Sequence, residues 1–130
     1  MKPWTPQRLA GLFLIGHAVV TVAVWCIFVF ITSAVDDTPL NRLLLQFSSP
    51  ESRPFFTVEA ALFVGVSLVL AAAFFAPFAR HKHGALALTA LVALHAVGNL
   101  ALVGVPPFVY LTIVCLIAYR GVQHAPQPTC

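Results

Sequence analysis

The chain has 130 residues, of which 60% are apolar and 8% charged, and its formal net charge is +3. A soluble domain carries about 25% charged residues, and seven basic and four acidic side chains cannot cover a globule of this size. The composition therefore excludes an ordinary soluble enzyme, a disordered chain and, despite the positive charge, a nucleic-acid-binding domain. It predicts a polytopic membrane protein, with the lipid bilayer as a partner.

Four apolar stretches divide the chain, at 9–31, 55–76, 84–104 and 106–120. A helix needs about 20 mostly apolar residues to cross a hydrocarbon core of ~30 Å. We therefore expect an all-α membrane protein, a bundle of four transmembrane helices in one domain over 1–120. The first stretch exceeds the roughly 7–15 apolar residues of a signal peptide, so it is expected to remain as a span. The last residues, 121–130, are predicted to form a disordered cytoplasmic tail.

A proline-containing break separates the third and fourth stretches, at Gly104-Val105-Pro106-Pro107. Proline lacks a backbone N–H and disfavours a helical conformation in the residue before it, so a continuous helix should end there. Proline is well tolerated at the start of the next helix. The pattern predicts a tight helical hairpin whose fourth span is thin or tilted. A re-entrant fourth segment is the alternative.

Basic residues mark one side of the predicted bundle. The side that holds both termini carries Lys2, Arg8, Arg80, Lys82 and Arg120, whereas the other carries Arg42 and Arg53. Lysine and arginine are enriched on the cytoplasmic side of membrane proteins. We therefore expect both termini in the cytoplasm (N-in/C-in) of a multi-pass protein in a bacterial inner membrane.

The long hydrophilic segment of the chain is the predicted outer loop at 36–54. Within it, apolar residues recur at the spacing of one helix face, at Leu40, Leu43, Leu44 and Phe47. This pattern predicts a short amphipathic helix lying on the outer leaflet. The alternatives are an ordered loop packed over the bundle and a docking site for a partner protein.

Two histidines lie inside the predicted spans at similar depth. At 1.5 Å per residue, His17 is roughly 12 Å and His95 roughly 16 Å from the cytoplasmic ends of their helices. Thr21 and Asn99 each follow a histidine by four residues, so each helix presents a two-residue polar stripe. Because ionisable groups are costly in hydrocarbon, His17, Thr21, His95 and Asn99 are the main candidates for an intramembrane site.

Three hypotheses cover the histidine pair. The first is ligation of a b-type haem iron by His17 and His95, placed on facing helices of a bundle. The second is a proton or cation pathway through the same two residues. The third is hydrogen bonding between helices, which contributes about 0.6 kcal/mol on average in membranes. The third is the simplest, so no cofactor is expected apart from this haem. No other metal site is expected, because His81 and His83 lie among basic residues.

Glu59 is the one acidic residue inside the predicted spans. It lies about one turn inside the outer end of the second helix, where the positive end of the helix dipole favours a carboxylate. The simpler interpretation is an acid at the start of a helix, in contact with headgroup water. The alternative is a substrate or ion ligand at the outer mouth of a pathway.

The chain carries no recognisable catalytic set. None of its serines, Ser67 included, lies in a G-x-S-x-G motif, and the chain contains no H-E-x-x-H motif. We therefore expect the protein to act by binding, as an accessory subunit, an assembly factor or an immunity-type partner of a larger membrane protein, or as a homo-oligomer. The competing hypothesis is a small transporter, an ion pathway or a haem b electron carrier that uses His17 and His95.

Overall fold

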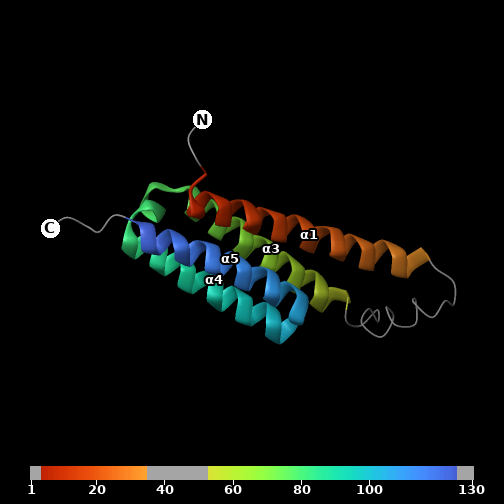
Figure 1. Cartoon of the computed structure of the whole chain (residues 1–130). Coiled ribbons are helices and arrows are strands. Elements are labelled where there is room, and N and C mark those ends of the chain that lie inside the picture. Colours follow the sequence, from red (N-terminus) through yellow and green to blue (C-terminus); the bar gives the residue numbers. More distant parts are fainter. Residues whose placement is uncertain (1–3, 35–52, 126–130) are drawn as a thin grey trace.

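The computed structural model describes residues 4–34 and 53–125 of the chain. These residues form four long helices and one short 3-10 turn, namely α1 (Pro6–Ala34), α3 (Arg53–Phe75), η1 (Pro77–Arg80), α4 (Lys82–Leu102) and α5 (Val105–His124). All four helices are long and apolar enough to cross a membrane. The predicted all-α fold with four candidate spans is therefore confirmed (Figure 1).

The four helices form an antiparallel bundle built from two pairs (Figure 1). Helix α1 packs chiefly against α3, and α4 packs chiefly against α5. The two pairs meet mainly across α1 and α5, whereas α3 and α4 contact each other less closely. The start of α1 and the end of α5 lie at one end of the bundle, which we call the terminal end. The turn between α4 and α5 lies at the opposite end, which we call the distal end (Figure 1).

The predicted break between the third and fourth helices is present as a tight turn. Helix α4 ends at Leu102, and the backbone N–H groups of Val103 and Gly104 both donate to the carbonyl oxygen of Asn99, at 2.8 and 2.9 Å. Gly104 has a φ of 136°, a conformation that side-chain-bearing residues rarely adopt. Helix α5 then begins with Val105-Pro106-Pro107, where the missing N–H groups cost no helical hydrogen bond.

Helix α5 is longer than the sequence pattern predicts. Its 20 residues give a length of about 30 Å at 1.5 Å per residue, so this segment is a full-length helix rather than a re-entrant turn. It also continues through Gly121 to His124, where the sequence predicts the start of a disordered tail. Gly121 and Val122 are buried, and a side chain at Gly121 would overlap Gln7 of α1. Packing against α1 therefore accounts for the extra helical turn.

Two further sequence predictions fall outside the described residues. One is the amphipathic outer helix that would carry Leu40, Leu43, Leu44 and Phe47, and the other is the tail beyond Ala125. Both stay predictions.

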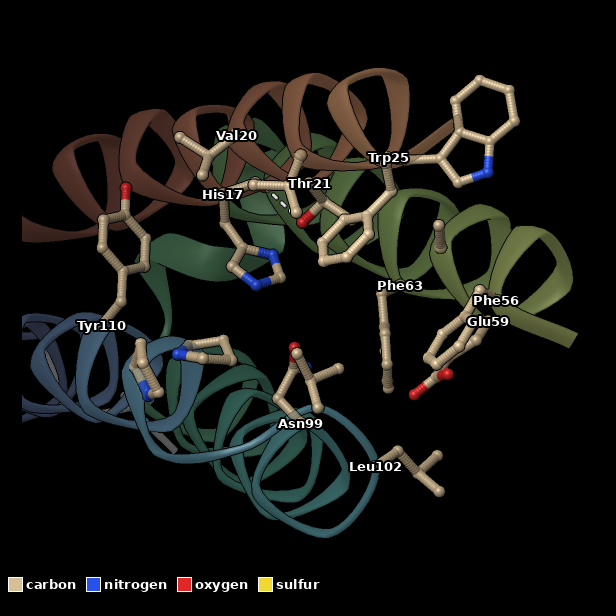
Figure 2. Close-up of a pocket in the computed structure, with 16 residues that line it drawn as sticks. His17, Val20, Thr21, Trp25, Phe56, Glu59, Phe63, Asn99, Leu102 and Tyr110 are labelled. Carbon is tan, nitrogen blue, oxygen red and sulfur yellow. Dashed lines mark hydrogen bonds between the residues drawn. The ribbon is translucent and has the colours of Figure 1, made fainter. Parts of the chain in front are cut away.

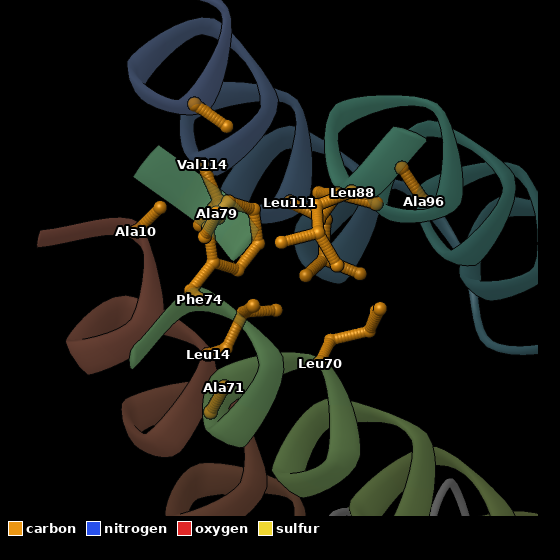
Figure 3. Packing of buried hydrophobic residues seen from close by; sticks show 12 residues of the cluster. Ala10, Leu14, Leu70, Ala71, Phe74, Ala79, Leu88, Ala96, Leu111 and Val114 are labelled. Carbon is orange, nitrogen blue, oxygen red and sulfur yellow. The ribbon is translucent and has the colours of Figure 1, made fainter. Parts of the chain in front are cut away.

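The closely packed core occupies the terminal half of the bundle (Figure 3). Buried residues from all four helices meet there with Ala79 of η1, among them Leu14, Phe74, Val92 and Leu111. Alanines at several buried positions let the helices approach closely, and close approach is what gives van der Waals contact between helices in a membrane. The terminal half is therefore the closely packed part of the bundle.

The outer surface of the bundle is apolar. Large side chains remain more than half exposed on every long helix, for example Val19, Val69, Leu94 and Leu116. Soluble monomers rarely expose contiguous apolar surface on this scale, whereas a lipid-facing surface requires it. The surface therefore agrees with the four candidate spans.

The contact between η1 and the first turn of α4 requires a glycine. A Cβ atom at Gly84 would overlap the carbonyl oxygen of Phe78 and come within 2.9 Å of its carbonyl carbon, and backbone atoms cannot rotate away as a side chain would. We expect Gly84→Ala to lower the free energy of unfolding in mild detergent by about 1–3 kcal/mol. In the control Gly65→Ala, no atom lies within 4 Å of the added Cβ, so stability should be unchanged or slightly raised. Equal stability of the two variants would contradict this interpretation.

Candidate functional site: a polar layer and an intramembrane cavity

A buried serine joins the two intramembrane histidines. The Ser67 hydroxyl on α3 lies 2.8 Å from Nδ1 of His17 on α1 and 2.8 Å from Nε2 of His95 on α4. The two imidazole rings lie 5.4 Å apart between centroids and are nearly perpendicular, at 83°. All three side chains are buried. Three helices thus meet in one hydrogen-bonded layer, which we call the polar layer and which also includes Asn99.

Asn99 sets the direction of the hydrogen bonds in the polar layer. Its amide nitrogen donates to the carbonyl oxygen of His95 at 2.9 Å and lies 3.5 Å from Nδ1 of the same residue. An amide N–H near Nδ1 favours the tautomer in which Nδ1 accepts and Nε2 carries the proton. His95 then donates to Ser67, and the single hydroxyl proton of Ser67 is donated to His17. Two neutral imidazoles are consistent with both contacts of Ser67.

Aromatic side chains hold the two imidazoles in place. The Tyr110 ring of α5 stacks on His17 at a centroid distance of 5.9 Å and an angle of 29°, and its hydroxyl donates to the carbonyl oxygen of Phe13 at 2.6 Å. The Phe63 ring lies 5.6 Å from the His95 ring. The polar layer is therefore fixed by contacts from all four helices, and it forms the boundary between the packed terminal half and the distal half.

A cavity of about 640 Å³ occupies the distal half of the bundle (Figure 2). Its walls come from α1, α3, the end of α4 and the start of α5, and most of its lining is apolar or aromatic. Val20 and Val103 line it and are both more than half exposed, at 58% and 57%, so the cavity is open at its side rather than enclosed. Its size falls within the range of about 300–1,000 Å³ that is typical of small-molecule sites.

Glu59 lies at the end of the cavity opposite His17 and Tyr110 (Figure 2). Its side chain is 7% exposed, and neither carboxylate oxygen has a hydrogen-bond partner among the described residues. It precedes Ser67 by eight residues of α3, which corresponds to about 12 Å along the helix axis. The cavity therefore has polar groups at both ends of an apolar body: the polar layer at one and Glu59 at the other.

The structure brings the predicted intramembrane residues together. His17, Thr21 and Asn99 line the cavity with Glu59, and His95 lies behind them in the polar layer. The Thr21 hydroxyl proton is not free to bind a ligand, because it is donated to the carbonyl oxygen of His17 at 2.7 Å. Two interpretations of Glu59 were expected, an acid at the start of a helix in contact with headgroup water and a ligand at the outer mouth of a pathway. Glu59 is buried in the cavity wall rather than exposed at the surface.

Sequence reasoning missed three residues of this site. Ser67 was considered only as a catalytic serine, although its depth carried a signal: it lies nine residues before the end of the predicted second span, or about 14 Å, which matches the depth of the histidines. Tyr110 and Trp25 were not singled out. The Trp25 indole N–H donates to the Thr57 hydroxyl at 3.1 Å and its ring lines the distal part of the cavity.

The haem hypothesis demands a different arrangement of the two histidines. A bis-histidine iron lies between two imidazole nitrogens with the macrocycle separating the rings. Here the Ser67 hydroxyl occupies the space between the two nitrogens, and hydrogen bonds hold it at 2.8 Å from each. Ligation would therefore require both hydrogen bonds to break and the rings to move apart.

Comparison of the chain with protein families, with characterised proteins and with solved structures finds no match. The function of the site is therefore inferred from its own geometry, in which an open apolar cavity lies between the hydrogen-bonded polar layer and a buried carboxylate that has no partner among the described residues.

Proposed function

We propose that the protein is a membrane-embedded binding protein that holds a small, largely apolar molecule in the distal cavity. The observation that carries this proposal is the cavity itself, about 640 Å³ in volume and lined mainly by apolar and aromatic residues. Small-molecule sites typically combine such a lining with a few fixed polar groups. Here those groups are the polar layer at one end and Glu59 at the other.

Entry from the bilayer agrees with the shape of the site. The exposed wall residues Val20 and Val103 lie on α1 and on the α4–α5 turn, and the outer surfaces of these helices are apolar. A molecule that partitions into lipid would reach this opening without crossing water. We propose that the bilayer supplies the bound molecule.

The orientation proposed for the protein places both termini in the cytoplasm of a bacterium, with the protein in the inner membrane. Among the basic residues of the described segments, Arg8, Arg80, Lys82 and Arg120 lie at the terminal end of the bundle, whereas Arg53 begins α3 at the distal end. This bias supports the orientation through the positive-inside rule. The cavity then opens in the outer half of the bilayer. A reporter fused after Cys130 that is active only in the cytoplasm should be active, and a periplasm-specific reporter at the same position should be inactive.

Two wider hypotheses stay predictions. A transport or ion pathway through His17 and His95 would have to open the packed core that closes the bundle on the terminal side of the polar layer. The protein could hold a ligand and also bind a larger membrane protein, as an accessory subunit, an assembly factor or an immunity-type partner. No docking face for such a partner stands out among residues 4–34 and 53–125.

Filling the cavity should abolish binding of a neutral apolar probe. Ala60 lines the cavity, whereas its neighbour Ala61 is exposed on the outside of α3. We expect Ala60→Phe to weaken binding of 4-phenylbutanol by roughly tenfold or more, because the added ring occupies the site, and Ala61→Phe to leave it unchanged. Trp25 fluorescence can report binding in a Trp4→Phe background, because the chain has two tryptophans.

The wild-type chain must bind 4-phenylbutanol saturably for the proposal to stand. Non-saturable partitioning into detergent, with the same signal in wild type, Ala60→Phe and Ala61→Phe, would overturn it.

A further inference from the structure

We propose that the molecule bound in the distal cavity is an amphipathic amine whose ammonium group pairs with Glu59. This inference rests on the proposed function, since it assigns the chemical class of the ligand to the same cavity. It goes further than the proposed function, because an apolar cavity alone would not favour a cationic molecule over a neutral one of the same size. The feature that decides between neutral and cationic ligands is the carboxylate at the distal end (Figure 2).

Within residues 4–34 and 53–125, Glu59 is a buried acid without a hydrogen-bond partner. Its side chain is only 7% exposed, and both carboxylate oxygens lack a hydrogen-bond donor among the described residues. Buried carboxylates in proteins are normally paired or hydrogen-bonded, because an isolated one is costly. The described lining contains no lysine or arginine that could supply the missing charge. A ligand in the cavity can supply the donor that the described lining lacks.

The aromatic residues near Glu59 suit a cation. Phe56 precedes Glu59 by three residues and Phe63 follows it by four, so both rings lie on the same face of α3 as the carboxylate. Trp25 lines the same end of the cavity from α1 (Figure 2). Aromatic faces attract ammonium groups, most strongly where water is excluded. The distal end of the cavity thus combines one negative charge with several aromatic rings.

The composition of the rest of the lining selects an organic cation over a metal ion. Hard metal cations take six or more oxygen ligands, whereas this end of the cavity offers one carboxylate. The remaining wall is mainly apolar and extends from Glu59 to His17. His17 contacts Ser67, which lies about 12 Å from Glu59 along α3. A ligand with one ammonium group and an apolar body satisfies both parts of the site.

Two sources share this chemistry, a membrane lipid with a primary amine in its headgroup and a free amphipathic amine. They are distinguished by competition in vesicles of phosphatidylcholine alone and of phosphatidylcholine with phosphatidylethanolamine. If the aminolipid is the natural occupant, added phosphatidylethanolamine should weaken binding of an amine probe. If a free amine is the occupant, binding should be equal in both vesicles. Each outcome retains the pairing with Glu59 and assigns its source.

The test compares two probes of the same size and shape, 4-phenylbutylamine, which is cationic at neutral pH, and 4-phenylbutanol, which is neutral. Both are titrated into the full-length wild-type chain with Trp25 fluorescence as the readout. We expect the amine to bind at least roughly tenfold more tightly than the alcohol, because hydrogen bonds to a charged group are strong. In Glu59→Gln the ratio of the two affinities should fall to about one, and in Glu59→Asp, which keeps the charge, the amine should still be preferred.

The two proposals fail in different ways. Equal affinities of the wild-type chain for the amine and the alcohol would overturn the pairing with Glu59 and leave the proposed function standing. An unchanged preference for the amine in Glu59→Gln would also overturn the pairing. Absence of saturable binding by either probe would overturn the proposed function itself.

Discussion

Replacing Ser67 with alanine is expected to lower the free energy of unfolding by about 2–4 kcal/mol. An average hydrogen bond between membrane helices contributes much less, about 0.6 kcal/mol. Ser67 differs from the average because one hydroxyl satisfies two buried imidazoles, at 2.8 Å from His17 and 2.8 Å from His95. Its removal leaves a donor on one ring and an acceptor on the other without this partner, at a position where Ser67 is fully buried, with 0% exposure.

The measurement is equilibrium unfolding in mild detergent, by SDS titration followed by circular dichroism. Thr112→Val is the matched control, because among the described residues the Thr112 hydroxyl donates to the carbonyl oxygen of Phe108 one turn earlier and to no other group. In this variant, loss of this bond within one helix breaks no contact between helices. Its stability should change by less than about 0.5 kcal/mol. A similarly small change in Ser67→Ala would show that the histidines do not depend on the serine bridge.

Truncating Phe74 to alanine is expected to cost about 3–5 kcal/mol, the range for large aromatic residues in packed cores. Phe74 is 2% exposed and lies in the terminal core with residues from all four helices (Figure 3). The closely packed surroundings cannot collapse fully into the space that its ring leaves. Because the terminal half carries the packing while the distal half is hollow, the loss of one core ring should destabilise the whole bundle.

The neighbouring residue provides the control for this prediction. Phe75 is 42% exposed on the outside of α3, where lipid or detergent can fill the space that its ring leaves. Phe75→Ala should therefore cost much less than Phe74→Ala in the same unfolding assay. Equal losses from the two truncations would mean that the terminal core does not dominate stability.

The fold was predictable from sequence because a membrane span has one dominant requirement, a long apolar run. That requirement located four helices, and the prolines after Gly104 located the turn between the last two. The boundary of α5 was not predictable in the same way. Residues from Gly121 to His124 are no longer uniformly apolar, and they stay helical because they pack on α1, a contact that hydropathy does not record.

The candidate site was predictable in part, for a related reason. His17 and His95 stood out because ionisable groups are rare in spans, and the i, i+4 spacing linked Thr21 and Asn99 to them. Ser67 is a mild polar residue that spans often contain, so only the comparison of depths between antiparallel helices could have singled it out. The cavity was beyond sequence reasoning, because it forms between the α1–α3 pair and the α4–α5 pair, and hydropathy does not record how helix pairs are spaced.

The central claim, that the distal cavity is a ligand site, is tested most directly by native mass spectrometry of the protein extracted from its membrane without added probe. We expect the wild-type chain and Ala61→Phe to carry a bound small molecule, and Ala60→Phe to have lost it. The mass of that molecule would also test the assignment of an amine. The same amount of bound molecule in all three proteins, or none in any of them, would contradict the claim.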